Sequence, residues 1–193
     1  MRRTLTATLA VAAALLATPA GAAPQRPQVT DPRGDAKAGA GEYDVLSVTW
    51  ETRKTGKAIK ELVVTMRLAA APDLSHGVGY EVYTYTPCGA IWIATYATPQ
   101  GETTRAGYGE CRAGGNVAVG LRPVVRKHAS AISWTVPASQ LHLKAGAEFY
   151  GMYGVSSPVE PLWGRSVSAQ AGIARETVAV DYASSATRWR YGS

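Results

Sequence analysis

Two stretches decide the fold: YDVLSVTWET at residues 43–52 and AIKELVVTMRL at residues 58–68. In both, apolar and polar residues alternate with a period of two, which indicates β-strands with one buried face. The residues between them, RKTGK at 53–57, are polar and include a glycine, as expected of a hairpin turn. The side chains predicted to face the core are Leu46, Val48 and Trp50 in the first strand and Leu62, Val64, Met66 and Leu68 in the second.

Strand-like runs continue along the chain, separated by turn residues about every 8–12 positions, and no helical stripe longer than two turns interrupts them. This spacing predicts an all-β, antiparallel β-sandwich that is jelly-roll-like. One short helical turn is expected at Pro137–Leu143, where a proline opens the turn. The further predicted strands are Gly79–Thr86, Ala90–Ala97, Thr103–Cys111, Asn116–Leu121, Ala129–Val136, Ala147–Tyr153 and Glu176–Tyr182.

Residues 1–23, MRRTLTATLAVAAALLATPAGAA, have the layout of a secretory signal peptide, with two arginines, an apolar run and small residues before the cleavage point. The run Leu9–Ala17 is shorter than the about 20 residues that cross a bilayer, so no membrane span is expected. Cleavage leaves 18 of the 20 basic residues against 14 acidic ones, without a charged block that would favour nucleic acid. We therefore expect a secreted, extracellular protein with a flexible segment at 24–41 and one sandwich domain at 42–193.

Cys88 and Cys111 are the only two cysteines in the chain. In an oxidising compartment such a pair indicates a disulfide. Closing a loop of about 24 residues would stabilise the fold by about 3 kcal/mol. The alternative is a catalytic thiol, which requires a histidine neighbour that the sequence does not suggest.

The stretch TDPRGD at 30–35, followed by EYD at 42–44, is the most motif-like part of the chain. Carboxylates on a glycine-containing turn can converge with backbone carbonyls, and oxygen ligands of this kind suit calcium. The alternative is that these aspartates only form hydrogen bonds within a turn. The candidate calcium ligands, including one near the last predicted strand, are Asp31, Asp35, Asp44 and Asp181.

TDPRGD at 30–35, YDVLSV at 43–48, LVVTMRL at 62–68 and ISWTVP at 132–137 occur in an order that resembles secreted bacterial sandwich domains of the DOMON and carbohydrate-binding family 9 type. The resemblance implies a jelly-roll-like sandwich that binds sugar or haem in some relatives, often with a calcium near the N-terminal loop. Haem ligation requires a methionine and a histidine at suitable places. Because Met66 is predicted to face the core and the three histidines have no paired spacing, no haem is expected.

Five tryptophans and ten tyrosines stand against one phenylalanine. Such rings combine an apolar face with a polar edge and suit sugar stacking, although they are also common in strands. The runs 79–86 and 90–97 each carry two aromatic residues on one face, and the long segment 154–175 carries one tryptophan. These residues form a recognition surface or pack against the core, whereas Trp50 and Trp134 are predicted to lie in the core. The candidate ligand-binding residues are Tyr83, Tyr85, Trp92, Tyr96 and Trp163.

No catalytic motif and no glycine-rich phosphate loop occurs in the sequence, so neither an enzyme class nor a nucleotide cofactor is indicated. The favoured function is a non-enzymatic binding module whose partner is a glycan or another cell-envelope polymer. The first alternative is a protein-interaction or inhibitor-like domain that binds an unknown secreted protein through long loops at 98–116 and 154–175. The second is a hydrolase whose carboxylates meet only in the fold. Scattered carboxylates of this kind are Glu81, Glu102, Glu110 and Glu148.

Overall fold

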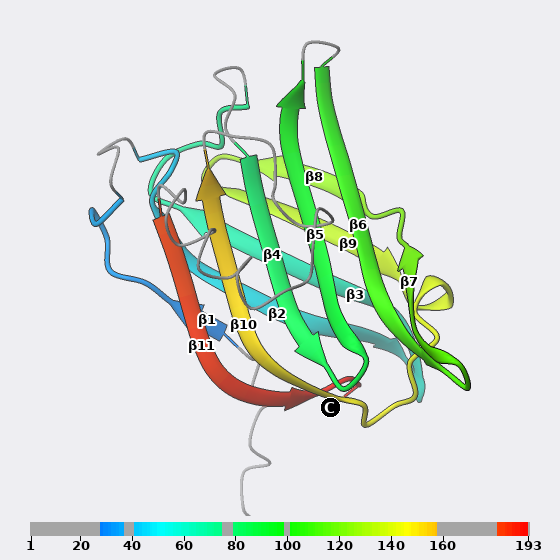
Figure 1. The fold of residues 1–193 in the computed structure, drawn as a ribbon. Helices are drawn as coiled ribbons and strands as arrows, with labels where there is room; N and C mark the ends of the chain where they lie inside the picture. The colour runs from blue at the N-terminus through cyan, green and yellow to red at the C-terminus, as the bar shows by residue number, and fades with distance from the viewer. Residues whose placement is uncertain (1–27, 37–40, 75–78, 99–100, 158–180, 193) are drawn as a thin grey trace, which may run out of the picture.

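Two antiparallel sheets packed face to face make up the computed structural model (Figure 1). Among the residues it describes, the only helical element is the 3-10 turn η1 (Ala138–Gln140), which falls inside the predicted Pro137–Leu143. The prediction of an all-β antiparallel sandwich is confirmed. The structure describes residues 28–36, 41–74, 79–98, 101–157 and 181–192, so the signal peptide and Trp163 lie outside it.

The two sheets have five and six strands, and every strand pair in the described residues is antiparallel. The five-stranded sheet has the order β1 (Gln28–Thr30), β2 (Val45–Thr55), β3 (Ala58–Leu68), β9 (Ala131–Pro137) and β8 (Val124–His128). The six-stranded sheet, in front in Figure 1, has the order β11 (Asp181–Arg190), β10 (Glu148–Ser157), β4 (Gly79–Thr86), β5 (Gly89–Thr98), β6 (Gly101–Arg112) and β7 (Gly115–Gly120).

The hairpin predicted around residues 53–57 is confirmed as β2–β3. The main differences between the predicted and the observed strands lie at the edges of the sheets. The segment 24–41 was expected to be flexible, yet it contains β1, which pairs with β2 through three residues. The run at 124–128 is not among the predicted strands and forms β8, whose side chains are mostly exposed and therefore show no clear alternation. The stretch 98–116 is mostly β6 and its turns rather than a long loop.

The C-terminal strand also differs from its prediction. β11 covers residues 181–190, whereas the sequence predicts a strand at 176–182, of which 176–180 lie outside the described residues. Trp189 of β11 and the following Tyr191 are buried in the main core. The ring of Trp189 lies 4.5 Å from that of Phe149 and 6.3 Å from that of Trp50, measured between centroids. The side chains of Trp189 and Tyr191 therefore fill part of the space between the two sheets.

The core is built from the inward sides of both sheets, and Trp50 and Trp134 lie in it as predicted. The indole Nε1 of Trp134 on β9 donates a hydrogen bond of 2.8 Å to Thr95 Oγ1 on β5, which joins the two sheets. Leu46 was predicted to face the core but is only half-buried. A register shift between Val45 and Ser47 interrupts the alternation and places Val45 in the core instead.

The predicted disulfide between Cys88 and Cys111 is present, with 5.2 Å between the two Cα atoms. It joins the turn between β4 and β5 to β6, so it closes part of the six-stranded sheet. Among the described residues, no helix has the length and apolarity needed to cross a membrane.

Candidate functional site

Strand pairing brings most of the predicted aromatic residues onto the outward side of the six-stranded sheet. Tyr83 on β4 lies opposite Trp92 on β5, and on its other side it lies opposite Tyr153 on β10. We refer to the group Tyr83, Tyr85, Trp92, Tyr150 and Tyr153 as the aromatic face.

The tyrosine rings of the aromatic face form one connected cluster. Tyr83 stacks on Tyr153 with 4.4 Å between ring centroids, and Tyr85 stacks on Tyr150 at 5.7 Å. Tyr85 also meets Tyr83 and Tyr153 edge to face, at 5.9 and 5.7 Å. These offset and edge-on arrangements are the favourable ones for aromatic pairs. The rings therefore hold one another in place before any ligand arrives.

The aromatic side chains differ in how much of each ring is exposed to a ligand. Tyr83 is 3% exposed and Tyr96 is 2% exposed, so neither presents a ring to a ligand. Tyr96 lies instead beneath the Arg105 guanidinium, 5.7 Å from its ring centroid. Tyr150 is 42% exposed, and Tyr85, Trp92 and Tyr153 are partly buried in a small cluster separate from the main core. The available rings are therefore Tyr85, Trp92, Tyr150 and Tyr153.

A glycine on the next strand makes room for Trp92. Gly107 on β6 lies opposite Trp92, and a Cβ atom on this glycine would be 3.0 Å from the indole Nε1. Real Cβ atoms rarely have neighbours that close. The indole can therefore lie over β6 because residue 107 has no side chain.

Sequence reasoning missed Tyr150 and Tyr153, because residues three apart in a regular strand face opposite sides. A register shift between Tyr150 and Met152 brings both tyrosines to the outward side. Gly151, with φ of 63°, occupies the irregular position. An isolated glycine inside a strand pattern is a recognised signal of a bulge, and it was present here.

The candidate calcium loop follows β1 and lies against the start of β2. The Asp31 amide donates to the Leu46 carbonyl at 3.0 Å, and the Gly34 amide donates to Asp44 Oδ2 at 2.7 Å. Asp44 is 4% exposed, and its Oδ1 has no hydrogen-bond partner among the described residues. Asp31 Oδ2 is buried as well. Two of the four predicted ligands thus have carboxylate oxygens removed from solvent.

The other two predicted ligands are placed differently. Asp35 is exposed, and Asp181 begins β11 opposite Ser156, with a side chain outside the part that the structure describes. Within the described residues no group of three or more histidine, cysteine, aspartate or glutamate side chains is arranged to hold a metal. The hydrogen bond from the Gly34 amide to Asp44 stabilises the turn at 31–35. Its acceptor is Asp44, which lies outside the turn, and not Asp31 or Asp35 within it.

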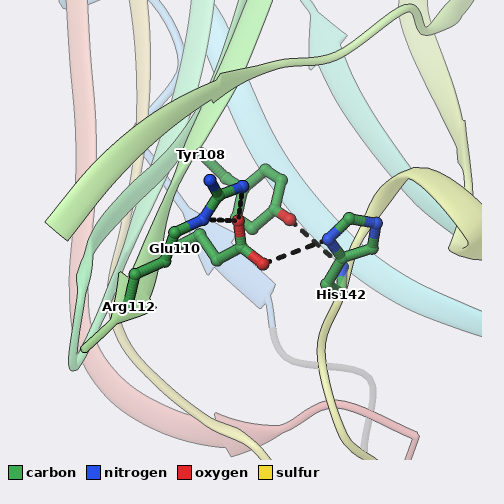
Figure 2. A network of polar contacts seen from close by, with 4 residues as sticks. All are labelled: Tyr108, Glu110, Arg112 and His142. Atoms are coloured by element: carbon green, nitrogen blue, oxygen red, sulfur yellow. Dashed lines mark hydrogen bonds and ion pairs between the residues drawn. The ribbon is translucent and has the colours of Figure 1, made fainter. Parts of the chain in front are cut away.

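A polar network absent from the sequence predictions lies near the disulfide (Figure 2). Glu110 Oε1 lies 3.1 Å from His142 Nδ1, and Arg112 donates to Glu110 Oε2 through Nε at 2.9 Å and Nη2 at 2.7 Å. The backbone amide of His142 donates to the Tyr108 hydroxyl at 3.2 Å. The Arg112 guanidinium, together with His142, lowers the pKa of Glu110. Glu110 and His142 are 32 residues apart in the sequence, so no short motif predicts that they are in contact.

The scattered carboxylates do not form an unpaired acid–base couple. Glu110 and Glu148 line the same cavity of about 460 Å³, but Glu110 is paired with Arg112 and Glu148 with Arg190 at 3.0 Å. Glu102 forms an ion pair with Lys127 on the neighbouring sheet. Glu81 is buried on the outward side of β4.

Comparisons of this chain with protein-family models, with curated proteins and with solved structures find no match.

Proposed function

We propose that this chain is a secreted, non-enzymatic binding module for carbohydrate, with a cell-envelope polymer as its ligand. The observation that carries this proposal is the aromatic face, in which four partly or fully exposed rings from three adjacent strands lie together. Sugar rings have apolar faces that stack on aromatic rings, while hydroxyl groups bind the polar edges of tyrosine and tryptophan.

The geometry favours a polymer over a single sugar. Trp92 on β5 and Tyr153 on β10 are the available rings on either side of the buried Tyr83 on β4. Neighbouring strands lie about 4.8 Å apart, so this row extends over about 10 Å. Tyr150 and Tyr85 add a second row beside it. Such a footprint offers stacking positions to more than one sugar unit of a chain.

Location outside the cell is supported by two features. Residues 1–23 have the signal-peptide layout, and the cysteines form a disulfide, a bond typical of oxidising compartments. A cell-envelope polymer is a ligand that a protein in this location would meet.

The alternatives gain less support from the geometry. A general acid in a glycosidase needs a raised pKa, whereas the pKa of Glu110 is lowered and both cavity carboxylates are paired with arginines. The protein-interaction alternative relied on loops at 98–116 and 154–175. The first of these is mostly strand, and most of the second lies outside the described residues.

Binding to insoluble envelope glycans in a sedimentation assay tests the proposal. We expect Trp92→Ala and Tyr150→Ala each to weaken binding about fivefold, since one stacking contact contributes about 1 kcal/mol and 1.4 kcal/mol corresponds to a factor of ten. Val124→Ala is the control, because Val124 is an exposed apolar residue on the other sheet. If both aromatic variants bound as well as the parent protein, the proposal would be wrong.

Calcium at the N-terminal loop is the second part of the proposal, with Asp31 and Asp44 as protein ligands. It is supported by the buried Asp44 Oδ1, because a buried carboxylate oxygen without a donor is costly unless a cation or proton meets it. Calcium at 100 times its Kd would stabilise the fold by about 2.7 kcal/mol. The melting temperature should therefore rise with calcium and fall with chelator, and Asp44→Asn should remove the difference. An unchanged melting temperature in excess chelator would exclude a stabilising calcium.

A further inference from the structure

A concave site lies at the end of the sandwich beside Thr86, whose carbonyl accepts a hydrogen bond of 3.2 Å from the Tyr150 hydroxyl of the aromatic face. It is bounded by the turn between β4 and β5, by β6 and by the connection from η1 to β10. Its volume of about 460 Å³ falls in the range of small-molecule sites, which are about 300–1,000 Å³. We call it the end pocket. Its apolar lining includes Pro87, Tyr108, Leu143, Ala147 and Phe149.

The walls of the end pocket are fixed by several independent contacts. The disulfide joins Cys88 in the turn to Cys111 on β6, and both residues line the pocket. Gly109 lies so close to the Cys88 carbonyl that a Cβ atom would collide with it. The Tyr108 hydroxyl accepts a hydrogen bond from the His142 backbone amide, which connects the η1–β10 segment to β6 (Figure 2). A rigid wall of this kind lowers the entropic cost of binding a ligand.

The charges at the mouth of the pocket are mostly neutralised in pairs. Glu110 is paired with Arg112, and Glu148 is paired with Arg190. Lys144 also lines the pocket, and its ammonium group has no ion-pair partner among the described residues. His142 lies beside it with Nδ1 directed to Glu110, as Figure 2 shows. Arg112 and Arg190 are not themselves lining residues, but once each glutamate is counted with its arginine partner, the Lys144 ammonium is the charge in the wall that has no counter-ion among the described residues.

We propose that the end pocket binds a small molecule with an apolar body and one anionic head group. The apolar body would lie against Pro87, Leu143 and Ala147, and the head group would meet Lys144 and the ring edge of His142. Small-molecule sites combine an apolar lining with a few polar groups that fix orientation, and this pocket has that composition. The inference is independent of the carbohydrate proposal, because it uses none of the residues of the aromatic face.

Three ten-carbon probes that differ only in the head group test this inference: decanoate, decanol and decylamine. Binding is measured by titration calorimetry at pH 7 on the processed protein, with circular dichroism and melting to confirm that each variant is folded. We expect decanoate to bind with one site per chain, at least tenfold more tightly than decanol or decylamine. Ala147→Leu places extra carbon atoms in the pocket wall and should weaken decanoate and decanol alike, at least tenfold.

The head-group contact is tested with the double variant Lys144→Gln and His142→Gln. It should bind decanoate and decanol equally. The matched control is Lys127→Gln with His128→Gln, which removes the same residue types from β8 on the other sheet and should keep the preference for decanoate. The inference is wrong if decanoate gives no binding, if the parent protein does not distinguish the three probes, or if the control loses the preference as the double variant does.

Discussion

The outward sides of the two sheets have the same alternating geometry but opposite chemistry. On the five-stranded sheet one row across the strands consists of Thr49, Thr65, Ser133 and Arg126. On the six-stranded sheet the corresponding kind of row consists of Tyr153, Tyr83, Trp92 and Gly107. The first row is polar, whereas the second is aromatic and ends in a residue without a side chain.

The six-stranded sheet thus carries a second apolar layer on its outward side. Tyr83 and Val155 are buried there, apart from the main core between the sheets. The outward residues of the six-stranded sheet are therefore expected to contribute to stability as well as to binding. Those of the five-stranded sheet are expected to contribute little to stability.

The largest effect should come from deleting one ring of the second layer. Tyr83→Ala removes a buried side chain that touches two other rings, so we expect a loss of about 3 kcal/mol in the free energy of unfolding. Thr65→Ala at the polar row should cost less than about 1 kcal/mol. Urea denaturation of both variants measures the difference. Equal losses would show that the two outward faces do not differ as proposed.

The disulfide also distinguishes the two sheets, because both of its cysteines belong to the six-stranded sheet or its turns. Replacing Cys88 and Cys111 by serine opens a loop with a sequence separation of 23, which should cost about 3 kcal/mol or slightly less. Hydrogen exchange should then increase more in β6 than in β3. A uniform increase across both sheets would contradict a local role for the disulfide.

A smaller effect is expected at the glycine beneath the tryptophan. Gly107→Ala should displace the Trp92 indole and cost about 1–2 kcal/mol, because the added Cβ crowds a ring that the neighbouring strands hold in place. Tryptophan fluorescence and urea denaturation measure the two consequences. Gly120→Ala on the adjacent strand is the control, since a Cβ there would meet no atom within 4 Å. Equal effects of the two substitutions would contradict the packing of Trp92 on Gly107.

The smallest effect should appear at acidic pH. The pKa of Glu110 is lowered below its ordinary value of 4.5, so its contribution to stability is present above that value and is lost as pH falls through the lower, folded pKa. Glu110→Gln should therefore reduce stability at pH 7 and have little effect at pH 2. Glu61→Gln, which removes an arginine-paired carboxylate from the five-stranded sheet, is the matched control. The same pH dependence in both variants would contradict a specific role for the Glu110 network.

Most of the fold could be predicted from the sequence because long runs alternate with a period of two. This pattern is clear in β3 and β9, where one side is more buried than the other. It fails where one side is not buried or the strand is irregular. β8 is mostly exposed. The register shift near Val45 places Val45, rather than the predicted Leu46, in the core.

The candidate sites could be predicted only where the side chains are close in sequence or on adjacent strands. Tyr83 and Trp92 lie on consecutive strands joined by a short turn, so the strand pattern was enough to name both as candidates, and the structure pairs them. Tyr153 reaches them from a distant strand, and Glu110 meets His142 across 32 residues. Such long-range contacts depend on the order of strands within a sheet, which alternation alone does not determine.

The position of the last described strand has a consequence for how the protein matures. Trp189 and Tyr191 fill the centre of the molecule beside Trp50, and β11 contacts β1 from the opposite end of the chain. The interior therefore stays incomplete until residue 191 has been made, and contacts between distant segments form slowly. For the exported protein proposed above, we therefore expect folding to be completed only after the last described strand has been synthesised.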